Sequence, residues 1–450
     1  MAKTDMTTAK KWSEMTWQER REERFKRWLS PRDVRFVSPA AEKAYKERVS
    51  RFIKAIKLEE ADRVPVILPA GYFPAFYAGV TYRTVMYDYA ELKRSWLKFL
   101  HEFDMDSFSG PGLVFPGKIL EALDVRTQKW PGHGMAADAW YHQFVEGEYM
   151  KADEYDRMMA DPTDYTLRVN LPRTNGLLEP LARLGALRFT YGGGMRLVAA
   201  LTDPGIRRTF QTLMDLADEY EKWREVVREV GDTALAEGVP NIRGGGMAGA
   251  PFDMFADALR GTHGIVMDMY RQPDKLIEAM DRMTPLMIDS VIAMANPDCP
   301  VVMMPLHKGD DTFMSDKQFD KFYWPTFRKL LLAMINEGLV PFPFAEGRYN
   351  SRLKQITDMP RGSIIWYFDQ TDMAGAKKVL GDVACIAGNV PSSLLVTGTP
   401  EAVKENCRRL IEDCAPGGGF ILTGGAGIDK GNPDNLRVMM DAAREYGSYK

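Results

Sequence analysis

The chain has 450 residues, of which 45% are hydrophobic and 27% are charged, so it can bury a large core. Its net charge of -3 gives no reason to expect a nucleic acid or an anionic membrane as a partner. No apolar run approaches the roughly 18 residues of a membrane-spanning helix, and the first residues lack the apolar segment of a secretion signal. We therefore expect a cytoplasmic protein with one large domain.

Residues 1–60 are expected to form a helical extension. Four aromatic side chains in it are interleaved with many charges: Trp12, Trp17, Phe25 and Trp28. An aromatic stripe on a charged helix must be covered by something. One interpretation is a docking surface for a second copy of the chain, as in a homo-oligomer, or for a partner protein; the other is an arm folded over the chain's own barrel. A second helix starts at Ser38 and Pro39.

Eight short apolar runs follow, with helical stretches between them. They are residues 64–68, 105–109, 241–245, 301–306, 340–344, 364–368, 384–387 and 420–422. Strands that alternate with helices predict an α/β fold, here a (β/α)8 TIM barrel over residues 61–450. A doubly wound sheet is less favoured, because no G-x-G-x-x-G follows the first run. The helix after Pro39 would close the bottom of this barrel with an apolar face: Tyr45, Val49, Phe52, Ile53 and Ile56.

Two further regions stand out. Residues 118–228 are too many for one connection, so we expect an insertion with its own helices, one of them over residues 209–230. Near the end, Pro400 opens a helix, and the last apolar run stops in a glycine-rich loop, residues 423–427. Glycines let backbone come close to a ligand. The four cysteines show no C-x-x-C pair, which favours buried, reduced thiols.

Side chains just after each barrel strand should converge at one end of the barrel. The candidates for catalysis there are His307, Glu346 and Asp369. The candidates for binding substrate or cofactor are Tyr72, Met247, Asp310, Asp311, Arg348, Asn389, Gly425 and Gly427.

Three interpretations of His307 stay open. It is a general acid or base with Glu346 or Asp310 as its partner, or it binds a hard metal together with Asp310, Asp311 and Glu346. The third is a structural histidine, hydrogen-bonded at the end of a strand. For Glu346 and Asp369, the alternative to ligand binding is a helix cap or a salt bridge with a neighbouring cation.

Three segments of the last quarter carry a family resemblance: residues 387–390, 398–403 and 424–428. They resemble the end of the uroporphyrinogen decarboxylase superfamily, which also contains zinc- and corrinoid-dependent methyltransferases. Weaker matches extend the resemblance from about Tyr45 to the C-terminus, at residues 62–66, 249–253 and 306–309. The resemblance implies the same (β/α)8 barrel.

The loop after the first strand departs from the decarboxylases. True uroporphyrinogen decarboxylases carry arginines there that bind the porphyrinogen propionates, whereas residues 68–74 of this chain contain no cation. Without guanidinium groups a molecule with many carboxylates has little to bind it. Decarboxylation of a porphyrinogen is therefore disfavoured.

The methyltransferase branch resembles the chain better. Those enzymes bind zinc through His-x-Cys after one strand and through a cysteine in the terminal glycine loop; related methionine synthases add a glutamate. By this resemblance His307 holds the histidine place and Glu346 is placed for the last ligand, but Gly309 and Ala426 stand where the thiolates would be. Zinc is not expected, and His307 and Glu346 are only weak metal candidates.

The sequence therefore predicts a corrinoid-dependent methyltransferase subunit. It would move a methyl group between methylcobalamin and a small, aromatic or apolar substrate, in a direction that the sequence does not indicate. A separate corrinoid protein would carry the cobalamin, because this chain has no D-x-H-x-x-G segment. Two alternatives stay open: a decarboxylase of a non-porphyrin acid, with Arg243 and Arg348 as candidate clamps, or a non-catalytic binding subunit of a methyltransferase complex that docks through the N-terminal aromatic helix.

Overall fold

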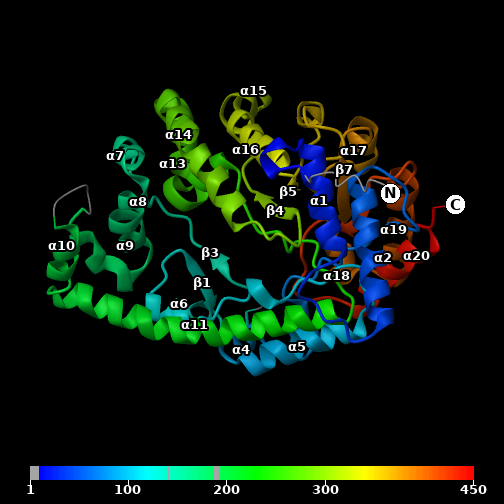
Figure 1. Cartoon of the computed structure of the whole chain (residues 1–450), viewed down its shortest axis with the longest axis horizontal. Coiled ribbons are helices and arrows are strands. Elements are labelled where there is room, and N and C mark those ends of the chain that lie inside the picture. The colour runs from blue at the N-terminus through cyan, green and yellow to red at the C-terminus, as the bar shows by residue number, and fades with distance from the viewer. Residues whose placement is uncertain (1–9, 140, 187–191, 450) are drawn as a thin grey trace, which may run out of the picture.

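The computed structural model describes residues 10–139, 141–186 and 192–449. Its centre is a five-stranded parallel sheet whose strands lie side by side in chain order (Figure 1). The strands are β4 (Val301–Leu306), β5 (Val340–Ala345), β6 (Ile365–Phe368), β7 (Cys385–Val390) and β8 (Phe420–Gly424). A helix separates most successive strands, so the fold is a TIM-barrel-like α/β fold. The last five predicted strands are thus confirmed.

The first three predicted strands are not regular strands: residues 64–68 lie beside β8, residues 241–245, mostly a turn, lie beside β4, and in the run 105–109 the Phe108 amide donates to the Pro240 carbonyl (2.9 Å). Next to β8, the Ile67 amide donates to the Leu422 carbonyl (3.0 Å), and next to β4, the Gly245 amide donates to the Val301 carbonyl (3.0 Å). Residues 64–68 and 105–109 do not pair as regular strands, because the Val66 amide donates to the Asp106 carboxylate (2.9 Å) and Pro65 has no amide to donate. The prediction of strands there was wrong, although the segments lie beside the expected neighbours.

Alternate side chains of the sheet form an interior core together with N-terminal helices. The sheet contributes Ile67, Ile242, Val301, Met303, Val340, Phe342, Ile365, Tyr367, Cys385, Ala387 and Ile421. Helix α2 (Pro39–Ile56) contributes the predicted apolar face, including Tyr45, Val49 and Phe52. Its first turn is capped as expected, since the Ser38 hydroxyl accepts the Ala41 amide (3.1 Å). Helix α2 therefore closes one end of the interior.

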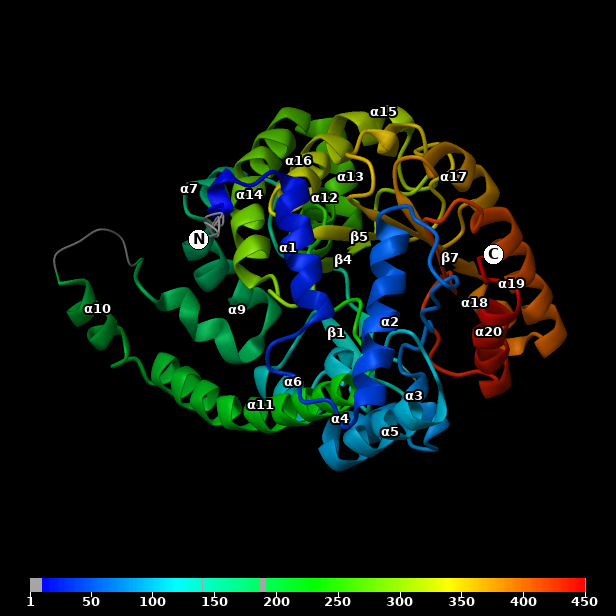
Figure 2. The same cartoon turned by 45° about the vertical axis from the view of Figure 1, so that its right-hand side comes forward.

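The aromatic stripe of the N-terminal stretch is covered by the chain itself. Helix α1 (Trp17–Leu29) buries Phe25 and Trp28 in the same interior core, and the Trp12 indole donates to Glu337 (2.8 Å). Figure 2 shows α1 and α2 in front of β4 and β5. Of the two interpretations of the stripe, the structure supports the arm that folds over its own barrel.

Helices pack on the outer face of the sheet and form an arc around it (Figure 1). They are α14 (Pro273–Met294), α16 (Trp324–Asn336), α17 (Met373–Leu380), α19 (Pro400–Cys414) and α20 (Pro433–Glu445). Three helices follow the edge segment at residues 64–70: α3 (Phe73–Tyr77), α4 (Tyr82–Tyr87) and α5 (Tyr89–Glu102). Helices α12 (Pro251–Phe255) and α13 (Gly261–Arg271) follow the edge segment beside β4, α15 (Asp316–Gln318) follows β4, and α18 (Ser392–Thr397) follows β7. The helix expected after Pro400 is α19.

The region of the expected insertion holds many short elements and one long helix. The short ones are α6 (Gly117–Leu123), β1 (Gln128–Pro131), β2 (Gly134–Met135), β3 (Gln143–Phe144), α7 (Tyr155–Ala160), α8 (Pro162–Tyr165), α9 (Leu171–Thr174) and α10 (Gly193–Ala200). Helix α11 (Pro204–Ala236) contains the predicted helix over 209–230 and runs along the lower edge of Figure 1. In the described part of the chain, no helix is long and apolar enough to cross a membrane.

Candidate active site

His307 pairs with a carboxylate that is distant in sequence. It directly follows β4, and its Nδ1 atom lies 2.5 Å from Oδ2 of Asp257, which belongs to the single-turn helix η5 (Ala256–Arg260). On the other side of the ring, Nε2 lies 3.8 Å from Oε1 of Glu346, which follows β5. The side chains of His307 and Glu346 are 42% and 44% exposed, so both can be reached from solvent. Two predicted catalytic residues therefore come together at the carboxyl ends of adjacent strands.

Asp253 fixes the position of the loop that carries His307. This buried carboxylate on α12 accepts the backbone amides of His307 and Lys308, both at 3.0 Å, and the Tyr323 hydroxyl at 2.8 Å. Burial raises its pKa to about 6, against an ordinary 3.8. Asp253 and Asp257 are four residues apart on successive helical turns, so one short segment both positions the loop and holds the imidazole.

The charges around the imidazole favour its protonated form. The hydrogen bond with Asp257 raises the pKa of His307 to about 9, against the opposing effect of burial. The imidazole is therefore an imidazolium near neutral pH. Partial burial raises the pKa of Glu346 and of Asp369 above the usual range for carboxyl groups. The arrangement suits proton donation from His307 better than proton removal by it.

Lys308 connects this site to the insertion. Its Nζ atom lies 3.6 Å from Asp257 Oδ1, donates to the Thr262 hydroxyl (2.9 Å) and lies 3.2 Å from Glu146 Oε1. Glu146 belongs to the expected insertion, residues 118–228. The insertion therefore contacts the lysine that follows His307.

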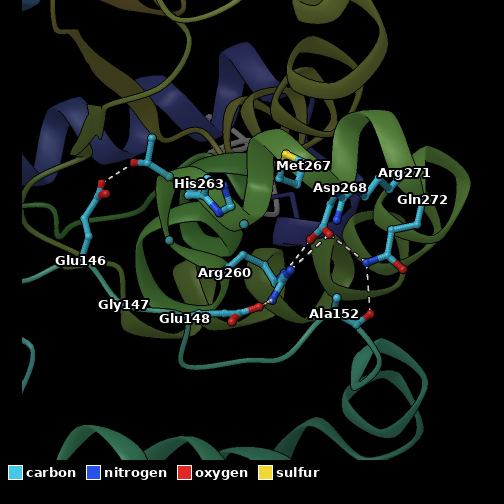
Figure 3. A pocket seen from close by; sticks show the side chains of 13 residues that line it. Glu146, Gly147, Glu148, Ala152, Arg260, His263, Met267, Asp268, Arg271 and Gln272 are labelled. Carbon is cyan, nitrogen blue, oxygen red and sulfur yellow. Dashed lines mark hydrogen bonds and ion pairs between the residues drawn. The ribbon is translucent and has the colours of Figure 1, made fainter.

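Behind Lys308 lies a cavity of 580 Å³, lined by residues 146–148, Ala152 and α13 (Figure 3). Three of its charged groups are paired, since Arg260 contacts Asp268 (2.5 Å) and Glu148 (2.7 Å). Gln272 completes the network by donating to Asp268 (2.8 Å). Because Arg260 already pairs with these carboxylates, we place the reactive site at His307 and not in this cavity.

Asp310, Asp311 and Arg348 do not join His307. Asp310 accepts the backbone amides of Thr312 and Phe313 (3.2 and 3.0 Å), and Asp311 accepts from Ser351 (3.0 Å). Neither forms a hydrogen bond or ion pair with His307. Arg348 is exposed. The partner of His307 is Asp257, which the sequence analysis missed.

Asp369 and Asn389 share a second cavity, of 710 Å³, with Ala426 and helix α19. Asp369 accepts the Gly347 amide (3.1 Å), and the Asn389 side chain donates to the Thr371 carbonyl (2.7 Å). A Cβ atom at Gly425 would lie 2.8 Å from the Asp369 carbonyl, whereas one at exposed Gly427 would meet only ordinary contacts, at 3.8 Å. Loop packing thus requires the glycine at 425.

Tyr72 and Met247 lie in two further loops, each of which follows an edge segment of the sheet. The Tyr72 amide donates to Asp429 (3.0 Å), and its hydroxyl lies 2.8 Å from Nδ1 of His142. Burial raises the pKa of Tyr72 to about 12. Met247 is 56% exposed. His142 comes from the insertion, and nothing in its sequence surroundings indicated this contact.

Comparisons with known proteins place this site in a family. The model of the uroporphyrinogen decarboxylase (URO-D) family matches residues 192–446. The chain belongs to the URO-D family. Uroporphyrinogen decarboxylase of Neisseria meningitidis serogroup C is 24% identical over 264 residues, which are 54% of this chain and 71% of that protein. The protein of that name from Pseudoalteromonas translucida is 23% identical over 214 residues, 45% of this chain and 59% of its own length.

A solved structure extends the likeness of fold beyond the matched segment. A methyltransferase from Methanosarcina mazei superimposes with a TM-score of 0.54, covering 88% of this chain and 98% of its own. The sequence identity is 16%, so the comparison concerns the fold. A coverage of 88% reaches into residues 1–191, where the family model has no match.

The residues present do not fit a thiolate zinc site of the kind that the family resemblance implies elsewhere. A Cβ atom at Gly309 would lie 2.5 Å from the Tyr349 hydroxyl and 2.9 Å from the Tyr323 ring, so a cysteine has no room there without a shift. All four cysteines are buried, as expected from the sequence, at positions outside these loops. Among the described residues, no group of three or more His, Cys, Asp or Glu could hold a metal ion.

Proposed function

We propose that this URO-D family chain is a methyltransferase subunit that takes a methyl group from a small aromatic or apolar substrate and passes it to a corrinoid on a partner protein. The observation that carries the proposal is the exposed His307, whose protonated form is stabilised by the contact with Asp257 (2.5 Å). An imidazolium can protonate an oxygen that loses its methyl group. This chemistry favours transfer from substrate to corrinoid.

The protein's own residues have three tasks in this proposal. Asp257 holds the Nδ1 proton and orients the ring, so that Nε2 carries the proton to be given away. The distance from Nε2 to Glu346 is 3.8 Å, which is longer than a hydrogen bond, and the Nε2 proton is therefore available to a substrate oxygen. Glu346 stabilises the positive charge of the ring until the proton leaves. The cobalt of a bound corrinoid would supply the methyl-accepting chemistry.

The exposed side of the site is open enough for the proposed corrinoid of a partner protein to approach His307. His307 and Glu346 are both reachable, exposed Met247 follows the edge segment, and a Cβ atom at Gly246 would meet no atom within 4 Å. The backbone φ of +121° at Gly246 also favours glycine. We further propose that residues 64–70, 105–109 and 241–248 close the sheet into an eight-membered barrel around this end.

Decarboxylation of a non-porphyrin acid is the second candidate. It is favoured by one observation: Arg243 is a half-buried cation whose side chain has no ion-pair partner in the described part of the chain. Decarboxylation of a porphyrinogen has less support, because the loop at residues 68–74 contains no arginine or lysine.

The test is an assay of the purified chain with an aryl methyl ether and reduced cobalamin, either free or on a corrinoid protein. We expect the absorption spectrum of methylcobalamin to appear together with the free phenol. The His307→Gln protein should lose this activity and keep its fold. Release of CO2 from an aryl carboxylic acid, with no dependence on any corrinoid, would replace the methyltransferase proposal with the decarboxylase.

A further inference from the structure

The side chain of Lys308 is held from outside the loop that carries it. Its Nζ atom donates to the Thr262 hydroxyl (2.9 Å) and lies 3.2 Å from Oε1 of Glu146. The Thr262 hydroxyl donates its own proton to Glu146. A hydroxyl has a single proton, so the Thr262 oxygen meets Lys308 as an acceptor. With its side chain only 14% exposed, Lys308 is therefore fixed between α13 and the insertion.

The ammonium group of Lys308 also faces the carboxylate that holds His307. Asp257 has one oxygen, Oδ1, 3.6 Å from Nζ of Lys308, and the other, Oδ2, 2.5 Å from Nδ1 of His307. Each oxygen of this carboxylate thus faces a different cation. The Asp257 side chain is 34% exposed, so water can reach it. A carboxylate with one contact can turn toward water, whereas two cations, one at each oxygen, keep it in place.

Lys308 acts on the imidazole in two opposite ways. As a positive charge near His307, it disfavours the imidazolium, whereas the carboxylates that act on the ring, Asp257, Glu346 and Asp253, favour it. As a partner of Asp257, it keeps the acceptor of the imidazolium in place. The hydrogen bond with Asp257 is the largest influence on the pKa of His307, so we expect the second effect to be stronger.

We infer that Lys308 is a positioning residue, which keeps the Asp257 carboxylate directed at His307 and is itself held by Glu146 of the insertion. Glu146 and Lys308 are 162 positions apart in the chain. The placement of the insertion would therefore determine how firmly the imidazole is held. The inference rests on the proposed function in treating His307 as the reactive group.

The test is an NMR titration of His307 in the full chain, without substrate or corrinoid, with the resonance assigned from the His307→Gln spectrum. Lys308→Met keeps the apolar stem and removes the ammonium group. We expect the pKa of His307 to fall from about 9 toward the ordinary 6.5, with a loss of at least about tenfold in proton affinity. Lys308→Arg should keep most of the wild-type value, because it retains the charge and the donors. The matched control is Lys321→Met, an exposed lysine, which should leave His307 unchanged.

The contribution of the insertion is tested in the same titration. Glu146→Gln should lower the pKa of His307 by a smaller amount, because Lys308 keeps its contact with Thr262. Glu148→Gln is the control from the same segment. It removes a carboxylate that pairs with Arg260, and it should leave His307 unchanged.

The direction of the shift decides the outcome. Loss of a neighbouring positive charge alone would raise the pKa of His307, so an unchanged or raised pKa in Lys308→Met would overturn the inference, as would an equal fall in Lys308→Arg. If Lys308→Met is insoluble, Thr262→Val decides: a fall supports the inference, and an unchanged pKa refutes it. The titration measures no turnover, so a fall in pKa without methyl transfer would refute the proposed function alone.

Discussion

The Nδ1 atom of His307 lies 2.5 Å from Oδ2 of Asp257, although 50 positions separate the two residues in the chain. The contact joins the carboxyl end of β4 to the short helices α12 and η5 that follow an edge segment of the sheet. Its effect is to hold the imidazole in one orientation and in its protonated form.

If His307 gives the proton to the leaving oxygen, His307→Gln should lower turnover by about 100-fold or more. The protein should stay folded, with a melting temperature that falls no further than that of Asp257→Asn, because both changes remove the same charged contact. The matched control is His101→Gln, which removes another exposed histidine paired with a carboxylate, Glu237 at 3.1 Å. Turnover and circular dichroism of the three proteins are the measurements. Full activity of His307→Gln would make the histidine structural.

Asp257→Asn should lower the pKa of His307 from about 9 toward the ordinary 6.5. The active imidazolium would then be lost at lower pH, so the upper limb of the pH–rate profile should shift in that direction. The contact stabilises the fold below the unfolded pKa of 6.5 and is lost as pH rises through about 9, so the variant's loss of stability should vanish above that pH. NMR titration of the His307 imidazole checks this pKa. The control is Glu237→Gln, which removes the carboxylate beside His101 and should leave the pKa of His307 unchanged.

Asp253→Ala should reduce the free energy of unfolding by roughly 3–5 kcal/mol, because it removes the buried acceptor of three donors, the amides of His307 and Lys308 and the Tyr323 hydroxyl. Asp253→Asn should cost less, since its amide oxygen can still accept. The folded pKa of about 6 exceeds the ordinary 3.8, so this group stabilises the fold of the wild type less as pH rises from about 4 to about 6. Urea titrations should show this trend in the wild type relative to Asp253→Asn. A parallel pH dependence of both proteins would contradict the assignment.

Much of the fold follows from local sequence signals. The proline and serine at 38–39 and the apolar periodicity after them predict α2 and its buried face, and the last five apolar runs become strands β4 to β8. The first two runs did not pair as regular strands, because a side chain, Asp106, takes the place of a backbone acceptor for Val66. A sequence pattern does not show such a replacement, since it depends on a contact between residues 40 positions apart.

The site was predictable only in part, for a similar reason. His307 and Glu346 follow consecutive strands, so topology alone brings them to one edge. Asp257 stands inside a helical stretch, where a carboxylate is ordinary. The spacing of Asp253 and Asp257 by four residues, close to the resemblance at 249–253, was the available signal for their common role.

Gly309→Ala should destabilise the protein by about 1–3 kcal/mol, because its methyl group would overlap Tyr349 and Tyr323. Tyr349→Phe alone should cost little, since the Tyr349 hydroxyl is buried without a hydrogen bond of adequate geometry. The double variant should recover part of the loss, because the phenylalanine lacks the oxygen at 2.5 Å. Thermal unfolding of the four proteins in a double-mutant cycle measures this coupling. Additive losses would show that the Tyr349 hydroxyl is not the obstacle.

The interior core joins opposite ends of the polypeptide. Phe52 on α2 and Ile421 on β8 belong to the same cluster of buried side chains, with 368 residues of chain between them. During synthesis, the apolar face of α2 therefore emerges from the ribosome long before the strands that will cover it. We expect slow folding, completed only after β8 has been released, and a nascent chain that depends on chaperones to keep this face from aggregating.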